Sequence, residues 1–261
     1  MSTVDKALNL LTLFSHDQPE FGLSELSRRS GHDKATTLRH ARSLIHSGLL
    51  EQDPHSRRYR LGAEILRLAN LREGLYPLRA LAHPIATELS VACQETVHVS
   101  ARAGDNLGTV LAHESTHTLR VVVEPGLQMP WHATASGIAL LAHLASTEQA
   151  HLLETSQQTH STLTHDALQR VHQAVEQAAI RGYAVSSDRL EHGVSGVAAA
   201  FFDNRNIPIG TIAVALSSAE LSETRERELG DAVIRAADLL SAQLGATRRK
   251  AHPPVSTGRA M

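Results

Sequence analysis

The chain has 261 residues, of which 42% are hydrophobic, 20% charged and 3% aromatic. This balance is typical of a folded globular protein and excludes an intrinsically disordered chain. The single cysteine, Cys93, excludes an internal disulfide and fits a reducing compartment. The sequence contains no apolar run long enough for a membrane span and does not begin with a secretory signal, so we expect a cytoplasmic protein.

The net charge of −2 is distributed unevenly along the chain. Residues 28–60 carry eight Arg and Lys against three Asp and Glu, a local charge of +5, which leaves −7 for the remainder. A basic segment on an acidic body is typical of a modular DNA-binding protein, because neutralising phosphates requires only local positive charge.

The N-terminal residues predict two short helices. Apolar residues recur at helical spacing from Val4 to Phe14. Ser24 has the position of an N-cap for a second helix, which runs to Ser30. The Gly31-His32 turn leads into a third helix, which completes a helix-turn-helix arrangement.

The third helix is the one expected to contact DNA. Asp33 is a suitable N-cap, and Gly48 is a suitable stop. On its own, this stretch is equally compatible with a solvated amphipathic helix, so the flanking segments decide. Its hydroxyls and cations, with two arginines of the second helix, are donors that reach phosphates and guanine edges. These predicted contacts are Arg28, Arg29, Lys34, Thr36, Thr37, Arg39 and Arg42.

After Gly48 the pattern changes to two short strands. Residues 49–52 are extended, residues 53–56 form a turn, and residues 57–61 return as the second strand of a hairpin. A lone basic hairpin is usually a solvated turn, but directly after a helix-turn-helix it indicates a wing. The side chains expected to touch phosphate or the minor groove are His55, Arg57 and Arg58.

The domain organisation follows from these breaks. Residues 1–62 form the DNA-binding domain, residues 63–77 a linker helix, and residues 78–246 a second domain. The linker helix is a candidate dimerisation element, with a simple spacer as the alternative. The tail, 247–261, lacks core residues and is expected to be disordered.

The second domain alternates strands and helices. Alternation and apolar runs predict strands over 96–100, 108–113, 119–123, 197–202 and 209–216, with an extended segment at 182–185. Helical spacing predicts helices over 136–145, 165–181 and 223–244.

The order of these motifs resembles the IclR family of bacterial transcriptional regulators, from about Val4 to Leu244. The most specific match runs from His132 to Gly137, HATASG, and further matches are Tyr59-Arg60-Leu61-Gly62 and Arg181-Gly182-Tyr183-Ala184-Val185. The resemblance implies an α+β protein, with a winged helix-turn-helix and a C-terminal GAF-like α/β effector-binding domain. It also implies homodimers or homotetramers on a pseudo-palindromic DNA operator, and a small organic acid as effector.

The segment from His132 to Gly137 is a small-residue loop that feeds a helix N-terminus, a place suited to a carboxylate. His132 either adds a donor or packs against Trp131. By resemblance, the effector-binding residues are Arg120, Val122, Trp131, His132, Ala133, Thr134, Ala135, Tyr183, Val185, Glu191, Ser195, Gly196, Ala213 and Ala215.

Several positions depart from the family pattern. Ser195-Gly196-Val197 stands where the family often has a cysteine, and Ala213 and Ala215 stand where many members have serines. These changes suggest a roomier, less polar pocket and an aromatic or otherwise apolar acid. In the recognition helix, Ala35 and His40-Ala41 also differ, so the bases it reads do not follow from the resemblance.

Two other classes of site have little support. A metal site built from His98, His113, His117 and His132 lacks the usual spacing with an acidic partner or a cysteine pair. A hydrolase would need a Gly-x-Ser-x-Gly elbow, which Gly193-Val194-Ser195-Gly196 does not provide. We therefore predict a ligand-responsive transcriptional regulator of a catabolic operon, without enzyme activity, cofactor or metal. A repressor is the default, and an activator is the alternative.

Overall fold

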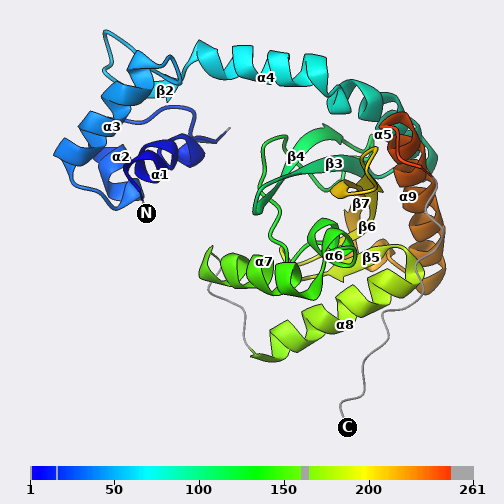
Figure 1. Ribbon diagram of the computed structural model, residues 1–261. Coiled ribbons are helices and arrows are strands. Elements are labelled where there is room, and N and C mark those ends of the chain that lie inside the picture. The colour runs from blue at the N-terminus through cyan, green and yellow to red at the C-terminus, as the bar shows by residue number, and fades with distance from the viewer. Residues whose placement is uncertain (1, 16, 160–164, 248–261) are drawn as a thin grey trace. The chain divides into compact units, whose positions relative to one another are not determined.

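The computed structural model describes residues 2–15, 17–159 and 165–247 (Figure 1). These residues form two compact units that divide between Pro77 and Leu78. Of the tail expected to be disordered, residues 248–261 lie outside the described residues.

The first unit is a winged helix-turn-helix. Its helices are α1 (Thr3–Leu8), α2 (Leu23–Ser30) and α3 (Lys34–His46), with a 3₁₀ turn at Leu11–Leu13. The single helix expected from Val4 to Phe14 is therefore two pieces. The chain bends after Leu8, which allows Leu10 to enter the core fully buried beside Phe21 and Leu26.

The ends of α3 agree with the sequence pattern. The Asp33 carboxylate accepts a hydrogen bond from the Thr36 amide at 2.9 Å, as an N-cap does. Gly48 follows the helix with φ 72°, in the left-handed region that ends helices. The assignment of Ser24 as N-cap of α2 is wrong. This helix begins at Leu23, after Gly22, whose amide donates to the Glu25 carboxylate at 2.9 Å.

The wing consists of β1 (Leu50–Gln52) and β2 (Tyr59–Leu61), paired antiparallel. The Asp53 carboxylate shapes the turn, because it accepts from the amides of His55 and Ser56 at 3.0 and 2.7 Å. Tyr59 is buried, and its backbone pairs with that of Phe21. The wing is thereby attached to the start of α2. Helix α4 (Ala63–Leu75) follows, with no buried residue.

The second unit contains one five-stranded antiparallel sheet in the order β4-β3-β7-β6-β5. The helix α5 precedes the sheet, α6 to α8 lie between β4 and β5 in sequence, and α9 ends the unit. The bounds are α5 Leu78–Cys93, β3 Thr96–Ala103, β4 Asn106–His113, α6 Ala135–Leu141, α7 Ser146–Thr159, α8 His165–Arg181, β5 Ala184–Ser187, β6 Val194–Phe202, β7 Pro208–Ser217, a 3₁₀ turn Ser218–Glu220, and α9 Glu223–Gln243.

Helices cover both faces of this sheet (Figure 1). Along β6, Val197, Ala199 and Phe201 pack with α5 and α9, while Ala198 and Ala200 pack with α6 and α8. This alternation is the two-residue period of a strand buried on both faces. The expected α+β class, with a winged helix-turn-helix and a C-terminal α/β domain, is confirmed.

The strand expected over 119–123 is wrong. These residues belong to an irregular connection between β4 and α6, and Leu119 is 92% exposed. The free edge of β4 is occupied by another part of this connection. The Met129 amide donates to the Leu107 carbonyl oxygen, and the Thr109 amide donates to the Leu127 carbonyl oxygen. The 119–123 segment therefore does not pair with the edge of β4, the strand that precedes it. Helix α7 was not anticipated at all.

Gly230 on α9 provides a test of the packing on the α5/α9 face. A Cβ at Gly230 would lie 2.6 Å from ring carbons of Tyr183, too close for any real contact. We expect Gly230→Ala to destabilise the second unit by about 1–3 kcal/mol through overpacking. Urea unfolding followed by the fluorescence of Trp131, the single tryptophan, measures this.

The control is the same substitution in a Tyr183→Leu background, where the ring is absent and the loss should shrink. Equal losses in both backgrounds would show that Tyr183 does not pack against Gly230.

Candidate functional site

The first unit presents a set of exposed basic side chains on α2, α3 and the wing. Thr36 is half-buried beside them on α3. The exposed members of the predicted DNA-contacting set are Arg28, Arg29, Lys34, Arg39, Arg42, His55 and Arg57.

Thr37 does not belong to this surface. Its side chain is completely buried, and its hydroxyl donates to the Asp33 carbonyl oxygen one turn earlier, at 2.9 Å. Such back-bonding is a usual way for a threonine within a helix to satisfy its hydroxyl. The prediction that the Thr37 side chain contacts DNA is therefore wrong.

Arg58 has an internal role. Its guanidinium donates to the Glu25 carboxylate at 3.1 Å and to the Glu20 carbonyl oxygen at 2.9 Å. The Gly22 amide and then Arg58 hold the pKa of Glu25 below its usual value. These contacts tie the wing to the start of α2. The Arg58 guanidinium, which was expected to touch DNA, is 38% exposed and already engaged within the protein, where it positions the wing.

His40 is a buried residue of α3 that sequence reasoning did not place. It is 2% exposed, and neither ring nitrogen has a hydrogen-bond partner within the described part of the chain. Burial lowers the pKa of His40, and the positive charge of Arg39 lowers it further. His40 is thus a neutral core residue behind the exposed face of α3.

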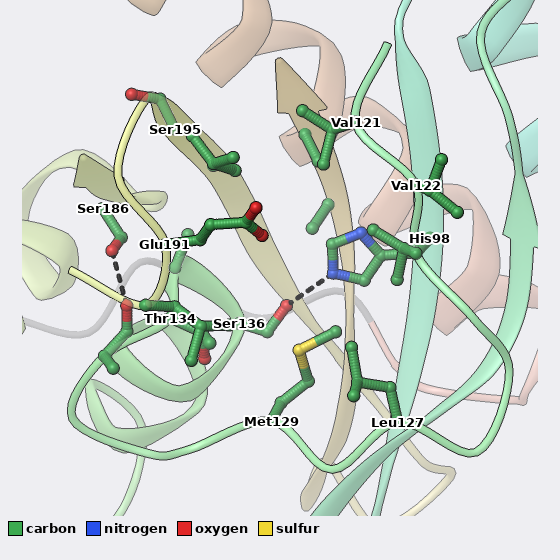
Figure 2. A pocket seen from close by; sticks show the side chains of 18 residues that line it. His98, Val121, Val122, Leu127, Met129, Thr134, Ser136, Ser186, Glu191 and Ser195 are labelled. Atoms are coloured by element: carbon green, nitrogen blue, oxygen red, sulfur yellow. Dashed lines mark hydrogen bonds between the residues drawn. The ribbon is translucent and has the colours of Figure 1, made fainter. Parts of the chain in front are cut away.

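The second unit contains a cavity of about 100 Å³ beside its sheet, partly open to solvent (Figure 2). Strands β3, β6 and β7 form its floor, and the first turn of α6 forms one side. The β4–α6 connection and the loop between β5 and β6 border its remaining sides. The lining residues are His98, Val121, Val122, Val123, Leu127, Met129, Ala133, Thr134, Ala135, Ser136, Ser186, Leu190, Glu191, Val194, Ser195, Gly196, Ala213 and Ala215.

His98 is the polar group at the floor of the cavity. Its side chain is 6% exposed, and its Nε2 lies 3.4 Å from Ser136 Oγ, which is long for a hydrogen bond. Its Nδ1 has no partner among the described residues. Burial lowers the pKa of His98 to about 4, so the ring is neutral at pH 7.

Three other hydroxyls of the lining are engaged with protein atoms. Thr134 Oγ1 donates to the Pro130 carbonyl oxygen and accepts from the Gly137 amide, which caps α6. Ser186 Oγ donates to the Ala133 carbonyl oxygen at 2.7 Å. Ser195 Oγ lies within hydrogen-bond distance of the Ser187 and Ser218 hydroxyls. These hydroxyls fix the walls of the cavity.

Glu191 is the charged side chain of the lining. It comes from the β5–β6 loop, and Figure 2 shows its carboxylate directed into the cavity. None of the described residues that line the cavity is Lys or Arg.

Nine of the fourteen residues expected at the effector site lie in this lining. They share two locations, the α6 entry with its neighbouring loops and the strands β6 and β7. They are Val122, Ala133, Thr134, Ala135, Glu191, Ser195, Gly196, Ala213 and Ala215.

Two of the other five lie on the opposite side of the sheet. Tyr183 and Val185 pack with α5 and α9, and Tyr183 Oη donates to Glu226 at 3.4 Å. Because side chains alternate along β5, Ser186, the residue after Val185, faces the cavity. The expectation for both residues is wrong.

The remaining three have other partners. Trp131 Nε1 donates to the Asp105 carbonyl oxygen at 2.8 Å, and His132 Nδ1 lies 2.7 Å from Ser156 Oγ. Arg120 is exposed and forms an ion pair with Glu114 at 2.7 Å. None of the three lines the cavity, so these expectations are corrected too.

Sequence reasoning did not name the other nine lining residues individually, although two of them lie in stretches expected at the pocket, Val121 in Arg120–Val122 and Ser136 in His132–Gly137. The alternation along β3 puts His98 on the cavity face, and Ser136 lies inside the matched HATASG segment, so both carried a usable signal. The other loop residues carried none, because their positions depend on how the connection folds over the sheet. The nine residues are His98, Val121, Val123, Leu127, Met129, Ser136, Ser186, Leu190 and Val194.

The described residues contain no group of three or more His, Cys, Asp or Glu placed to hold a metal ion. His98 lines the cavity, His113 Nε2 bonds with Thr87 at 3.0 Å, and His132 with Ser156. In the same part of the chain, no helix is both long and apolar enough to cross a membrane.

The buried His98 makes the second unit sensitive to acid. The pKa of His98 is about 4 in the folded protein and ordinarily 6.5, so between these values the unfolded chain binds a proton that the folded chain does not. Stability is therefore lost as the pH falls. The free energy of unfolding should drop by about 2 kcal/mol between pH 7 and pH 5 on account of this group.

Urea unfolding at both pH values, followed by Trp131 fluorescence, checks this, with His98→Leu expected to remove most of the difference. His192→Leu, at an exposed position, serves as the matched control. A His98→Leu protein with undiminished pH dependence would contradict the assignment.

Two models of known families match the chain. The IclR helix-turn-helix domain matches residues 3–54, and the bacterial transcriptional regulator IclR C-terminal domain matches residues 75–242. The glycerol operon regulatory protein of Streptomyces coelicolor is 29% identical, over 95% of this chain and 98% of its own. The transcriptional repressor IclR of Escherichia coli is 24% identical, over 95% of this chain and 92% of its own.

Solved structures show the same fold. An IclR transcriptional regulator from Silicibacter sp. TM1040 superposes with a TM-score of 0.83 at 30% identity, covering 97% of this chain and 100% of that one. An IclR homologue from Microbacterium hydrocarbonoxydans, in complex with 4-hydroxybenzoate, has a TM-score of 0.71 at 18% identity, covering 92% and 100% of the two chains.

The C-terminal match alone spans more than half of the chain, and the family consists of DNA-binding transcriptional regulators, not enzymes. The winged helix-turn-helix, the antiparallel sheet with its cavity and these matches agree: this chain belongs to the IclR family of bacterial transcriptional regulators.

Proposed function

We propose that this regulator is a repressor of a catabolic operon, acts in the cytoplasm, and releases or tightens its operator when a small organic effector binds in the cavity of the second unit. The observation that supports the effector role is the cavity itself. On its largely apolar floor lies the His98 ring, whose Nδ1 has no hydrogen-bond partner among the described residues. Repression is favoured by the relative from Escherichia coli, whose name describes a repressor. An activator with the same architecture remains the second candidate.

On the DNA side, the proposed contacts are the exposed cations of α2, α3 and the wing. Arginine and lysine at these places reach phosphates and guanine edges. Thr36 is half-buried on the same helix and completes the set. The proposed contacts are Arg28, Arg29, Lys34, Thr36, Arg39, Arg42, His55 and Arg57.

The linker helix supports a proposal of self-association. In α4, Leu68, Leu71 and Leu75 follow one another at helical spacing and are 44%, 55% and 68% exposed. An apolar stripe of this kind on a helix without buried residues is suited to a second copy. A homodimer, or a homotetramer built from it, would match a pseudo-palindromic operator.

Two observations bear on the charge of the effector, and they point in opposite directions. The family resemblance favours an organic acid, and the relative from Microbacterium hydrocarbonoxydans holds 4-hydroxybenzoate. The lining of the present cavity has a carboxylate and no Lys or Arg among its described residues.

Arg39→Ala tests the DNA-binding surface. Loss of one phosphate or guanine contact should weaken binding to the neighbouring intergenic DNA at least about fivefold. It should also reduce the dependence of affinity on salt. Electrophoretic mobility shifts at two salt concentrations measure both effects.

The matched control is Arg227→Ala, an exposed arginine of α9 in the other unit. A wild-type protein that binds no such DNA at low salt would overturn the proposed operator. If Arg39→Ala lost effector binding and DNA binding equally, α3 would have a structural role instead.

Leu71→Glu tests the proposed dimer. A charge in the apolar stripe of α4 should shift the protein from dimer to monomer in sedimentation velocity and lower operator affinity along with it. Asn70→Glu places the same charge on the opposite side of α4 and should leave the dimer intact. A Leu71→Glu protein that sediments as the wild type does would exclude this stripe as the interface.

A further inference from the structure

The cavity presents no positive charge to a ligand. Glu191 directs a carboxylate into it, and no Lys or Arg is found among the described residues of its lining. Arg120, next in sequence to the lining, is exposed and paired with Glu114. His98 is neutral, since burial holds its pKa at about 4. A carboxylate ligand here would face a like charge with no cation of the described lining to offset it, which disfavours it.

Helix α6 does not supply the missing charge. It has only seven residues, Ala135–Leu141, so its dipole is that of fewer than two turns. One of its first amides, that of Gly137, is already bonded to Thr134 Oγ1 at 3.0 Å.

The polar groups that remain under-bonded are suited to a hydroxyl. His98 Nδ1 has no partner in the described chain, and Nε2 has only the 3.4 Å approach of Ser136 Oγ. A ligand that forms a hydrogen bond with a buried, unpartnered polar group is stabilised by that bond. A hydroxyl both donates and accepts, so it can pair with either tautomer of His98 and also donate to the Glu191 carboxylate.

The size of the space beside His98 favours a small ligand. Its volume is about 100 Å³. An apolar cavity that holds benzene measures roughly 150 Å³. The apolar wall from Val121 to Val123, with Leu127 and Met129, suits a short carbon skeleton instead.

We infer that the effector is a small, uncharged aliphatic molecule with hydroxyl groups, a diol or triol of a few carbons, bound through His98 and Glu191. This inference rests on the proposed effector role of the cavity and specifies its ligand class.

Matched probes that differ only in charge test the inference. Propane-1,2-diol and glycerol are compared with lactate and glycerate, which replace one end by a carboxylate, and with benzoate as an aromatic acid. The full-length protein is titrated by calorimetry at constant ionic strength and at about 10 mM ligand or below, where exclusion of polyols from the surface has little effect. The diol or triol should bind at least about tenfold more tightly than its acid. Tighter binding of any of the acids, or no binding of either neutral probe, would overturn the inference.

Two variants locate the binding. His98→Leu keeps the bulk of the side chain and should weaken binding of the neutral probe about tenfold, the value of one buried hydrogen bond. Glu191→Gln, at an exposed position that should tolerate it, removes the like charge and should raise the affinity for lactate and glycerate relative to the neutral probes. Glu176→Gln, on the exposed side of α8, is the matched control. If Glu191→Gln left the ratio of the affinities for the acids and the neutral probes unchanged, the charge argument would be refuted. This outcome is decisive even if His98→Leu failed to fold.

Operator affinity, measured with each bound probe, separates this inference from the proposed function. If an acid binds more tightly and changes operator affinity, the effector role holds and the uncharged class is wrong. If a neutral probe binds in the cavity without changing operator affinity, the ligand class holds and the effector role fails.

Discussion

The second unit depends on one constraint, the two-residue period of the central strands β6 and β7. Both strands are buried on both faces over most of their length, so their apolar residues alternate between the α5/α9 core and the α6/α8 core. The residues on the cavity side are short: Gly196, Ala213 and Ala215 leave unfilled the space that larger side chains occupy on the other face. A shift of one residue in register would exchange the faces and fill the cavity.

The sequence predicted most elements whose formation depends on local chemistry. Asp33 and Gly48 mark the ends of α3, and α8 has its predicted bounds, because caps and apolar spacing are local signals. The segment from Val121 to Val123 has strong strand propensity, but residues 126–129 occupy the edge of β4, and the segment lines the cavity instead. Tyr183 was placed by resemblance, and only the packing against α9 shows which face of the sheet it covers.

The same limit applies to the first unit. Thr37 and Arg58 have the residue types that contact DNA, yet one bonds within its own helix and the other ties the wing to α2. Sequence pattern identifies donors, whereas the fold decides which of them are already engaged. The exposed cations that remain, Arg39 among them, carry the surface that a phosphate backbone can approach.

A ligand as small as a triol is sufficient for regulation. The best small ligands gain at most roughly 1.5 kcal/mol per heavy atom, so six heavy atoms have a ceiling of roughly 9 kcal/mol. Allosteric coupling typically needs about 1–3 kcal/mol of difference between two states. That difference must come from contacts that change between the states. His98 lies on β3, an interior strand of the sheet, and Glu191 lies on an exposed loop. A hydroxylic ligand that joins them would favour the state in which the loop closes on the sheet.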